Sequence, residues 1–271
     1  MHYTTYLPSG DLAGFIKCCW TLEAEQQEQP QQQVIVPDGC MEMIFHYGDL
    51  YRQYTAAGDS FLQPRCFVFG QLTAPLTIEP SGKTGIFAVR FQPDGFMPFC
   101  TQPVQALEDK AVALDALFGK EGSLLAGSVL AAGTAAARIG LVEQFLRQHI
   151  ADPATIDRIV RATASTILEL DGSMPVGALA RNLDISRRSL ERRFAAAVGL
   201  SPKQLSRIIR LQAALQLLLR GQGSNLTHLA YDRDYYDQAH FIRDFKAFTG
   251  YTPKQFYNGR LELSRLFQGQ Q

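Results

Sequence analysis

Apolar residues follow one pattern in the first third of the chain and another in the rest. Between residues 12 and 91, short runs rich in β-branched and aromatic residues are separated by Pro, Gly and Asp. The clearest runs span residues 34–36, 41–47, 65–72 and 85–91. Such runs are typical of strands, and they predict an antiparallel sandwich or barrel. The polar, low-complexity residues 26–33 predict an exposed hairpin loop.

After residue 91 the apolar residues recur at helical spacing. One group predicts a short helix, and a second predicts a longer helix that either faces the core or pairs with its copy in a dimer. The first group is Leu107, Val112, Leu114, Leu117 and Phe118, and the second is Ile139, Val142, Phe145, Leu146 and Ile150. Asp152 before Pro153 has the pattern of a helix start, and the helical pattern continues almost without a break from there. The sequence therefore predicts an α+β fold, with a β-rich domain over residues 1–155 and an all-α domain over residues 156–271.

The charges are divided unevenly between these two parts. The whole chain has 26 Lys and Arg against 26 Asp and Glu, a formal net charge of zero. Residues 1–156 hold 9 basic and 16 acidic side chains, a net of −7, and residues 157–271 hold 17 and 10, a net of +7. A basic second half favours nucleic acid or another anionic surface as its partner.

The residues with metal or redox chemistry are few and scattered. All five cysteines lie in the acidic half, in an odd number and without CxxC spacing, which favours reduced thiols in the cytoplasm. The adjacent Cys18 and Cys19 are either buried small hydrophobes or a redox trigger. Cupin-type metal sites use closely spaced histidines, and this half has only His2, His46 and His149, so we expect His46 to be a hydrogen-bonded strand residue. We expect no metal ion, no cofactor and no enzymatic activity.

The second half contains an internal duplication. Six residues between positions 192 and 204 recur 51 positions later, where Leu190 is also matched by Phe241, and three upstream residues recur 50 positions later. Each copy has the pattern of a helix, a tight turn and a second helix. We expect the first helix-turn-helix unit over about residues 176–198 and the second over about 226–249, with Ser186 and Asp237 as the N-caps of their second helices.

The second helix of each unit has one apolar face and one face of small and basic residues. At 100° per residue, the apolar faces comprise Leu190, Phe194, Ala197 and Val198 in the first unit and Phe241, Phe245 and Phe248 in the second. The opposite faces carry Arg188, Arg192 and Ala195, and Ala239, Arg243 and Lys246. Such a face suits insertion into a DNA major groove, where arginine can bind guanine through two hydrogen bonds. The alternative is a helical bundle whose arginines are only solvated.

A third helix is predicted between the two units. Residues 204–220 carry an apolar stripe at helical spacing. A helix of about 16 residues is about 24 Å long. Such a spacer could hold two recognition helices about one DNA turn apart, near 34 Å, on one face of the duplex.

Residues 176–257 resemble the DNA-binding domain of AraC/XylS-type transcription regulators. The resemblance is most specific in YYDQAHFIRDFKAFTGYTPKQFY and is also present in SRRSLERRFAAAVGLSPKQL. The family usually has glycine in each inter-helix turn, whereas this chain has Asp184 and Asp234. Aspartate tolerates left-handed backbone better than most residues, so we expect both turns to form.

The resemblance also implies which side chains contact DNA. The implied base-contacting residues are Arg188, Glu191, Arg192, Gln238, Ala239 and Arg243. Lys246 is the implied phosphate contact, which positions the protein without reading sequence. We also expect phosphate contacts from Ser186 and His240, with capping of the turn as the alternative for His240.

The first half resembles an uncharacterised β-rich domain that often precedes this DNA-binding unit, through the segments VIVPDGCMEMIFHYGD and IFAVRFQPDGF. The resemblance implies a cupin-like fold that serves sensing or dimerisation. Trp20, Phe45 and Phe69 are the expected effector pocket, with core packing as the alternative for Trp20.

These observations predict a cytoplasmic, sequence-specific transcription regulator. Its expected partners are double-stranded DNA, RNA polymerase, an unknown small-molecule effector and a second copy of the chain. Residues 124–142 are alanine-rich and contain three glycines and an arginine, which does not favour a membrane span. One alternative is an enzyme or damage-response protein that uses a cysteine or a metal in the first half and is tethered to DNA. The other is an architectural protein that binds DNA without sequence preference.

Overall fold

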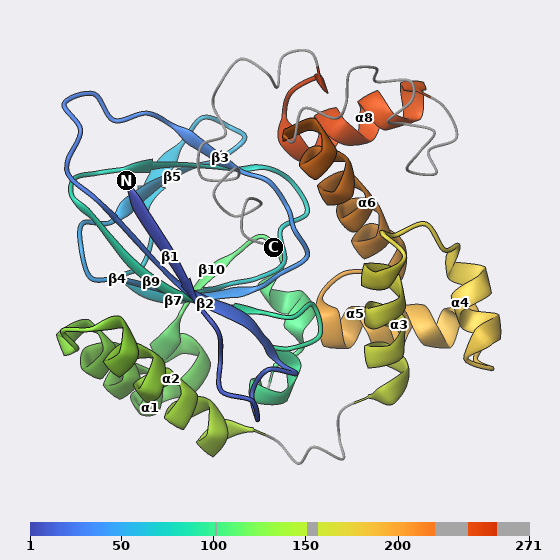
Figure 1. Cartoon of the computed structure of the whole chain (residues 1–271), viewed down its shortest axis with the longest axis horizontal. Coiled ribbons are helices and arrows are strands. Elements are labelled where there is room, and N and C mark those ends of the chain that lie inside the picture. The colour runs from blue at the N-terminus through green and yellow to red at the C-terminus, as the bar shows by residue number, and fades with distance from the viewer. Residues whose placement is uncertain (101, 151–156, 220–237, 254–271) are drawn as a thin grey trace.

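The computed structural model describes residues 1–100, 102–150, 157–219 and 238–253. A β-rich N-terminal domain precedes a helical C-terminal domain, as the sequence predicts (Figure 1). The strands are β1 (His2–Tyr6), β2 (Ile16–Ala24), β3 (Gln33–Ile35), β4 (Glu42–His46), β5 (Tyr51–Tyr54), β6 (Ser60–Leu62), β7 (Cys66–Phe69), β8 (Leu76–Pro80), β9 (Thr84–Phe91) and β10 (Ala111–Ala113). The helices are η1 (Met97–Phe99), η2 (Val104–Leu107), α1 (Leu114–Ala131), α2 (Ala135–His149), α3 (Arg158–Glu169), α4 (Val176–Asn182), α5 (Arg187–Val198), α6 (Pro202–Leu219) and α8 (Gln238–Thr249).

The strands form two antiparallel sheets that face each other. One sheet has the order β1-β2-β9-β4-β7-β10, and the other has the order β3-β8-β5-β6. Every recorded strand pair is antiparallel, which confirms the prediction from the short apolar runs. The polar segment expected to be a hairpin loop is exposed over residues 26–32, and only Gln33 belongs to a strand.

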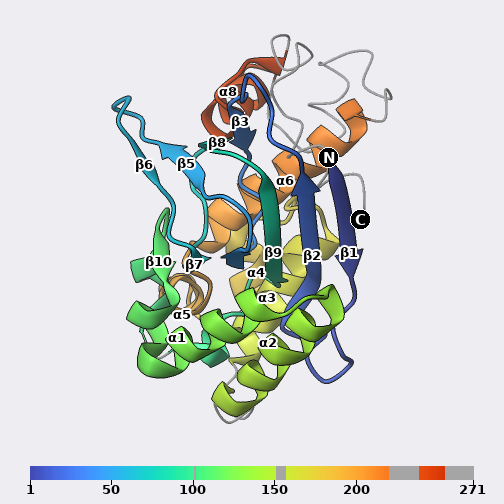
Figure 2. The same ribbon diagram turned by 90° about the vertical axis from the view of Figure 1, so that its left-hand side faces the viewer.

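The larger sheet is buried on both faces, which explains its nearly continuous apolar strands. In β4, Met43 and Phe45 point toward α1 and α2, whereas Glu42, Ile44 and His46 point into the space between the sheets. Side chains alternate between the two faces along a strand, so β4 supplies a wall to both compartments. Helices α1 and α2 cover the outer face (Figure 2).

The helix expected from the group beginning at Leu107 starts later than predicted. Leu107 ends the short turn η2, and Val112 lies in β10, where it pairs with Val68 of β7. The helix α1 begins only at Leu114. A strand partner far away in the sequence outweighs the local helical spacing here.

The helix α2 faces the core. Val142 and Leu146 are at most 1% exposed and pack with the larger sheet. Thr134 caps the helix by accepting a hydrogen bond from the backbone N–H of Ala137 at 3.2 Å.

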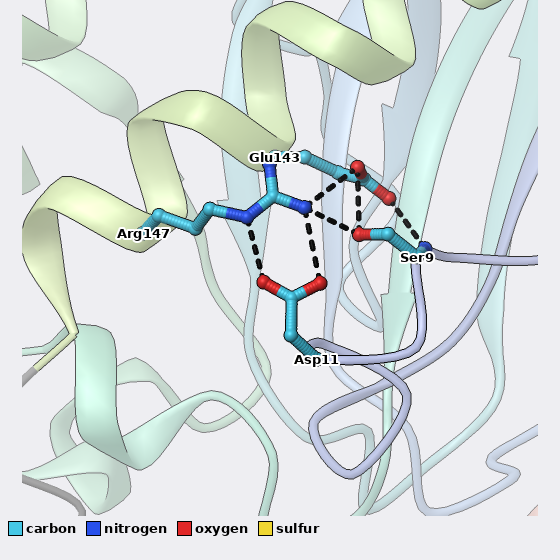
Figure 3. Close-up of polar contacts among 4 residues, drawn as sticks. All are labelled: Ser9, Asp11, Glu143 and Arg147. Atoms are coloured by element: carbon cyan, nitrogen blue, oxygen red, sulfur yellow. Dashed lines mark hydrogen bonds and ion pairs between the residues drawn. The ribbon is translucent and has the colours of Figure 1, made fainter.

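A polar cluster fixes α2 to the loop between β1 and β2 (Figure 3). The carboxylate of Glu143 accepts hydrogen bonds from the backbone N–H of Ser9 at 2.7 Å and from its hydroxyl at 2.8 Å. Arg147 donates two hydrogen bonds to Asp11, at 2.7 and 3.1 Å, and these hold the pKa of the Asp11 carboxyl well below its usual range. The half-exposed Arg147–Asp11 pair is screened by water, so the buried Glu143 is the stronger anchor.

The C-terminal helices share one apolar core, which includes Ile167, Phe194, Leu211 and Phe245. Asp157 caps α3 through its side chain and accepts a hydrogen bond from Arg193 of α5 at 2.5 Å. The predicted domain boundary at residues 155/156 and the helix start at Asp152 lie outside the described residues.

The segment between β3 and β4 joins the two domains. Val34 and Val36 belong to the apolar core of the C-terminal helices. Gln212 of α6 donates a hydrogen bond to the carbonyl of Pro37 at 2.6 Å. A Cβ atom on Gly39 would lie only 2.6 Å from Cδ1 of Leu205 on α6, so the backbone of Gly39 lies directly against that helix.

Candidate DNA-binding surface and interior cavity

The first helix-turn-helix unit has the predicted elements. Its helices are α4 (Val176–Asn182) and α5 (Arg187–Val198), and the hydroxyl of Ser186 caps α5 by accepting from the N–H of Ser189 at 3.2 Å. Asp184 in the turn has a φ of +48°, which confirms that an aspartate replaces the usual glycine in left-handed backbone. Gly199 ends α5 with a φ of +84°.

The two faces of α5 divide as the helical spacing predicts. Leu190, Phe194 and Val198 are fully buried in the core of the C-terminal domain. Arg188 and Arg192 are exposed. Glu191 is partly buried, and its carboxylate accepts a hydrogen bond from Arg187, one turn earlier, at 2.9 Å.

A longer helix, α6 (Pro202–Leu219), follows this unit. Ser201 and Gln204 cap it reciprocally: the Ser201 hydroxyl accepts from the N–H of Gln204 at 3.2 Å, and the Gln204 side chain accepts from the N–H of Ser201 at 2.9 Å. With 18 residues, α6 is about 27 Å long, close to the predicted spacer.

The recognition helix of the second unit is α8 (Gln238–Thr249). Phe241, Phe245 and Phe248 are buried, whereas Ala239, Arg243 and Lys246 are exposed. This is the division that the sequence predicts. The other helix of this unit, the N-cap Asp237, the turn residue Asp234 and the side chains of Gln238 and His240 lie outside the described residues.

A buried ion pair attaches α8 to α6. Asp244 is 2% exposed and accepts two hydrogen bonds from Arg207, at 2.8 and 3.2 Å. The same guanidinium lies over the ring of Phe248, 5.0 Å from its centre. These contacts fix the orientation of α8, so its exposed residues are held by the spacer rather than by a loop.

The spacer helix α6 carries both exposed basic helices. In Figure 1, α5 lies near the start of α6, and α8 crosses α6, to which it is attached through Arg207. Basic side chains are therefore exposed at two places on one rigid helix. This arrangement can present two positively charged helices to a polyanion.

The space between the two sheets contains a cavity of about 80 Å³. Trp20 and Phe69, two of the three residues expected to form an effector pocket, line it. Phe45 does not lie with them, because it points to the other face of β4 and is fully buried against α1 and α2. Gln212 of α6 is also part of the lining, so the C-terminal domain contributes to the wall of the cavity.

The cavity contains charged side chains that the sequence analysis missed. Arg90 donates a hydrogen bond to Glu42 at 2.7 Å and lies 3.5 Å from Asp38, and the indole N–H of Trp20 donates to Glu42 at 3.0 Å. Burial lowers the pKa of Arg90, but the two carboxylates more than offset this and hold it well above the ordinary value. The sequence did contain a signal for these side chains, because Glu42 and Arg90 are charged residues within the apolar runs 41–47 and 85–91.

His46 lines the opposite part of the cavity. Its side chain is 1% exposed, and neither ring nitrogen has a hydrogen-bond partner among the described residues. The prediction that His46 lies in a strand is therefore confirmed, and the prediction that its side chain is hydrogen-bonded is wrong. Burial, with a smaller effect of Arg65, lowers the pKa of His46 to about 4, although a loose interaction with Gln63 works in the other direction.

The thiols are not activated. Burial raises the pKa of all five cysteines, to about 12 for Cys19 and Cys40 and to about 11 for Cys66. Reactive cysteines instead have lowered pKa values, because the thiolate is the nucleophile. Within the described ranges, no three His, Cys, Asp or Glu side chains are grouped so as to hold a metal ion. None of the helices described is both long enough and apolar enough to cross a membrane.

Two family models match the chain. Residues 4–113 match a domain of unknown function, DUF6597, and residues 179–259 match a helix-turn-helix domain. No curated protein matches the chain in sequence.

Several solved structures show a distant similarity. ToxT from Vibrio cholerae is 9% identical over 88% of this chain and 97% of its own, with a TM-score of 0.48. ToxT in a complex with an unsaturated fatty acid is 12% identical over 88% of this chain and 98% of its own, with a TM-score of 0.42. The C-terminal domain of AraT, a response regulator from Geobacillus stearothermophilus, is 26% identical over 40% of this chain and 89% of its own, with a TM-score of 0.36.

The second family model begins within α4 and covers the rest of the first unit, the spacer helix and α8, which are the elements that expose the basic residues. This match supports a DNA-binding transcription regulator. The C-terminal part of the chain matches a helix-turn-helix domain of the AraC type, and the N-terminal part matches a DUF6597 domain.

Proposed function

We propose that the chain binds a specific DNA site with both recognition helices and that its N-terminal domain adjusts this binding in response to a small molecule. The observation that carries the first part is the repeated division of α5 and α8 into a buried apolar face and an exposed basic face. Arg192 and Arg243 occupy equivalent exposed positions in the two copies. In a helical bundle whose arginines were only solvated, nothing would require an exposed arginine at the same position in both copies.

Each DNA-facing residue has a distinct role in this proposal. Bases are contacted by Arg188, Glu191, Arg192, Gln238, Ala239 and Arg243, and phosphates by Ser186, His240 and Lys246. Arginine can donate two hydrogen bonds to guanine, and the small Ala239 lets the backbone of α8 approach the groove. Glu191 would have to leave Arg187 to accept a hydrogen bond from cytosine.

The cavity is the proposed effector pocket, with Trp20 and Phe69 in its wall. The segment that contains Pro37, Asp38 and Gly39 supports this, because one side of it lines the cavity and the other side packs on α6. A ligand that moves Asp38 therefore also moves the backbone segment against which the spacer helix packs. Binding in the cavity can then change how the two recognition helices are held.

The remaining partners follow from this role. We also propose that the chain acts in the cytoplasm, contacts RNA polymerase and binds DNA as a homodimer. The raised thiol pKa values favour this role over a DNA-tethered enzyme that uses a cysteine.

Selection of bound duplexes from a random DNA pool tests the proposal. We expect enrichment of two short conserved blocks whose centres are about 10 base pairs apart, because a spacer of this length could hold the recognition helices about one DNA turn apart. Recovery of DNA without any sequence enrichment would instead support an architectural DNA-binding protein.

A further inference from the structure

The cavity has two polar ends and an apolar middle. In the register of the larger sheet, Glu42 pairs with Arg90 at one end, Ile44 with Ala88 in the middle and His46 with Ile86 at the other end. Glu42 and His46 lie four residue steps apart along β4, which corresponds to about 13 Å along the cavity. The walls between the ends are formed by apolar side chains, including Leu22 and Ile78.

The first end offers hydrogen-bond acceptors rather than positive charge. Glu42 and Asp38 provide two carboxylates against the one guanidinium of Arg90, a formal net charge of −1 for these lining side chains. Lys17 does not line the cavity, but its charge affects the nearby Cys40, and including it brings the formal net charge at this end only to zero. Asp38 lies 3.5 Å from Arg90, a long contact that leaves it able to accept a stronger hydrogen bond. A ligand carboxylate would be repelled here, whereas an ammonium, hydroxyl or amide N–H would be bound.

The second end offers one donor and one acceptor. A neutral imidazole has one N–H and one unprotonated nitrogen, and the lowered pKa of His46 keeps the ring neutral near pH 7. Neither nitrogen is satisfied by the described residues, although the ring stacks on Tyr51 at 5.7 Å. Leaving a buried polar group without a partner is costly, so natural structures rarely do so without a reason. A ligand hydroxyl would supply both a donor and an acceptor.

We infer that the cavity binds an elongated ligand with an apolar body, a cationic or uncharged hydrogen-bond donor at the Asp38–Glu42 end and a hydroxyl at the His46 end. The inference rests on the proposed role of the cavity as an effector pocket and adds the chemical class of the effector. It excludes simple carboxylates such as fatty acids.

A matched series of six-carbon probes tests this class on the full-length chain. The probes are 6-amino-1-hexanol, 1,6-hexanediol and 6-hydroxyhexanoate, which differ only in the group offered to the acidic end. Calorimetric titration should give measurable binding of the amine and the diol, with the carboxylate at least about tenfold weaker than the amine because of its repulsion by Asp38 and Glu42. Equal binding of all three probes, tightest binding of the carboxylate, or no binding of any would overturn the inference.

One variant and its matched control test the acidic end. Asp38→Asn keeps an oxygen that can accept from the N–H of Cys40 at 3.0 Å but removes the charge, so it should abolish the preference for the amine over the carboxylate. Asp59→Asn makes the same chemical change at an exposed turn residue and should leave the preference intact. If both variants behave alike, Asp38 does not select the ligand.

His46→Phe separates a ligand-binding role from a structural one. Phenylalanine keeps the stacking on Tyr51 and removes the unsatisfied nitrogens, so the variant should melt at an equal or higher temperature than the wild type while binding the amino alcohol at least about tenfold more weakly. A lower melting temperature with unchanged binding would show that His46 serves only the fold. Binding is measured without DNA, so failure of DNA recognition would leave these results intact, and failure of probe binding would leave DNA recognition intact.

Discussion

The contact between Gly39 and the spacer helix gives the sharpest test of how the two domains are joined. Gly39 has a φ of +77°, and a Cβ atom there would lie 2.6 Å from Cδ1 of Leu205 and 3.6 Å from Cδ1 of Ile209. Gly58 has a φ of +92°, and a Cβ atom there would have no neighbour within 4 Å. The two glycines therefore share a left-handed backbone and differ in their contact with α6.

This difference makes Gly58→Ala a matched control for Gly39→Ala. Both substitutions introduce left-handed backbone strain of about 1–2 kcal/mol. Gly39→Ala must also push Leu205 away by about 1 Å to restore ordinary van der Waals contact, and overpacking of this kind costs about 1–3 kcal/mol. We therefore expect Gly39→Ala to lower the free energy of unfolding by about 1–3 kcal/mol more than Gly58→Ala does.

Urea unfolding of the full-length chain measures both values. Equal losses for the two variants would mean that the segment between β3 and β4 is not held against α6. In that case the proposed route from the cavity to the recognition helices would lose its structural basis.

Three further predictions concern the DNA contacts, the ion pair and the buried imidazole. Arg192→Ala and Arg243→Ala should each weaken binding to the selected site by about 1–3 kcal/mol and relax specificity at different base positions, whereas Lys246→Ala should weaken binding to all sequences and reduce the slope of log affinity against log salt by about one. Wild-type affinity in both arginine variants, or an unchanged salt slope for Lys246→Ala, would contradict these roles. Arg207→Met should destabilise the chain by about 3–5 kcal/mol, because it leaves the 3% exposed Asp244 side chain without its guanidinium. Asp244→Asn should cost less, because the 35% exposed Arg207 side chain can turn to water. Urea unfolding that gives the reverse order would refute this. Burial lowers the pKa of His46 from 6.5 to about 4, so the unfolded chain binds more protons than the folded chain between these pH values. The wild type should therefore lose up to about 3 kcal/mol more stability than His46→Phe as the pH falls from 6.5 to 4. Parallel curves of stability against pH for the two proteins would show that His46 is not buried in its neutral form.

The local signals in the sequence were sufficient for the helix-turn-helix unit. The helices α4 and α5 have the predicted bounds because apolar periodicity, the N-cap Ser186 and the C-terminal Gly199 all act over a few residues. The same local chemistry places Asp184 in left-handed backbone. The division of α8 into apolar and basic faces follows from its helical period alone.

Features that depend on distant partners were predicted less well. Val112 adopts a strand because β7 offers it a partner, and no local pattern reveals that pairing. Phe45 was expected beside Trp20, but which face of β4 lines the cavity is set by the position of the second sheet and of α1. The role of Gln212 is also hidden in the sequence, because it reaches Pro37 across 175 positions of the chain.

The central claim is that this chain recognises a particular DNA sequence. The most direct test is the ratio of its affinity for the selected duplex to its affinity for a scrambled duplex of the same length and composition, measured at one physiological salt concentration. We predict a ratio of about 10³ or more, which is typical of specific regulators. Equal affinity for the two duplexes would contradict the claim.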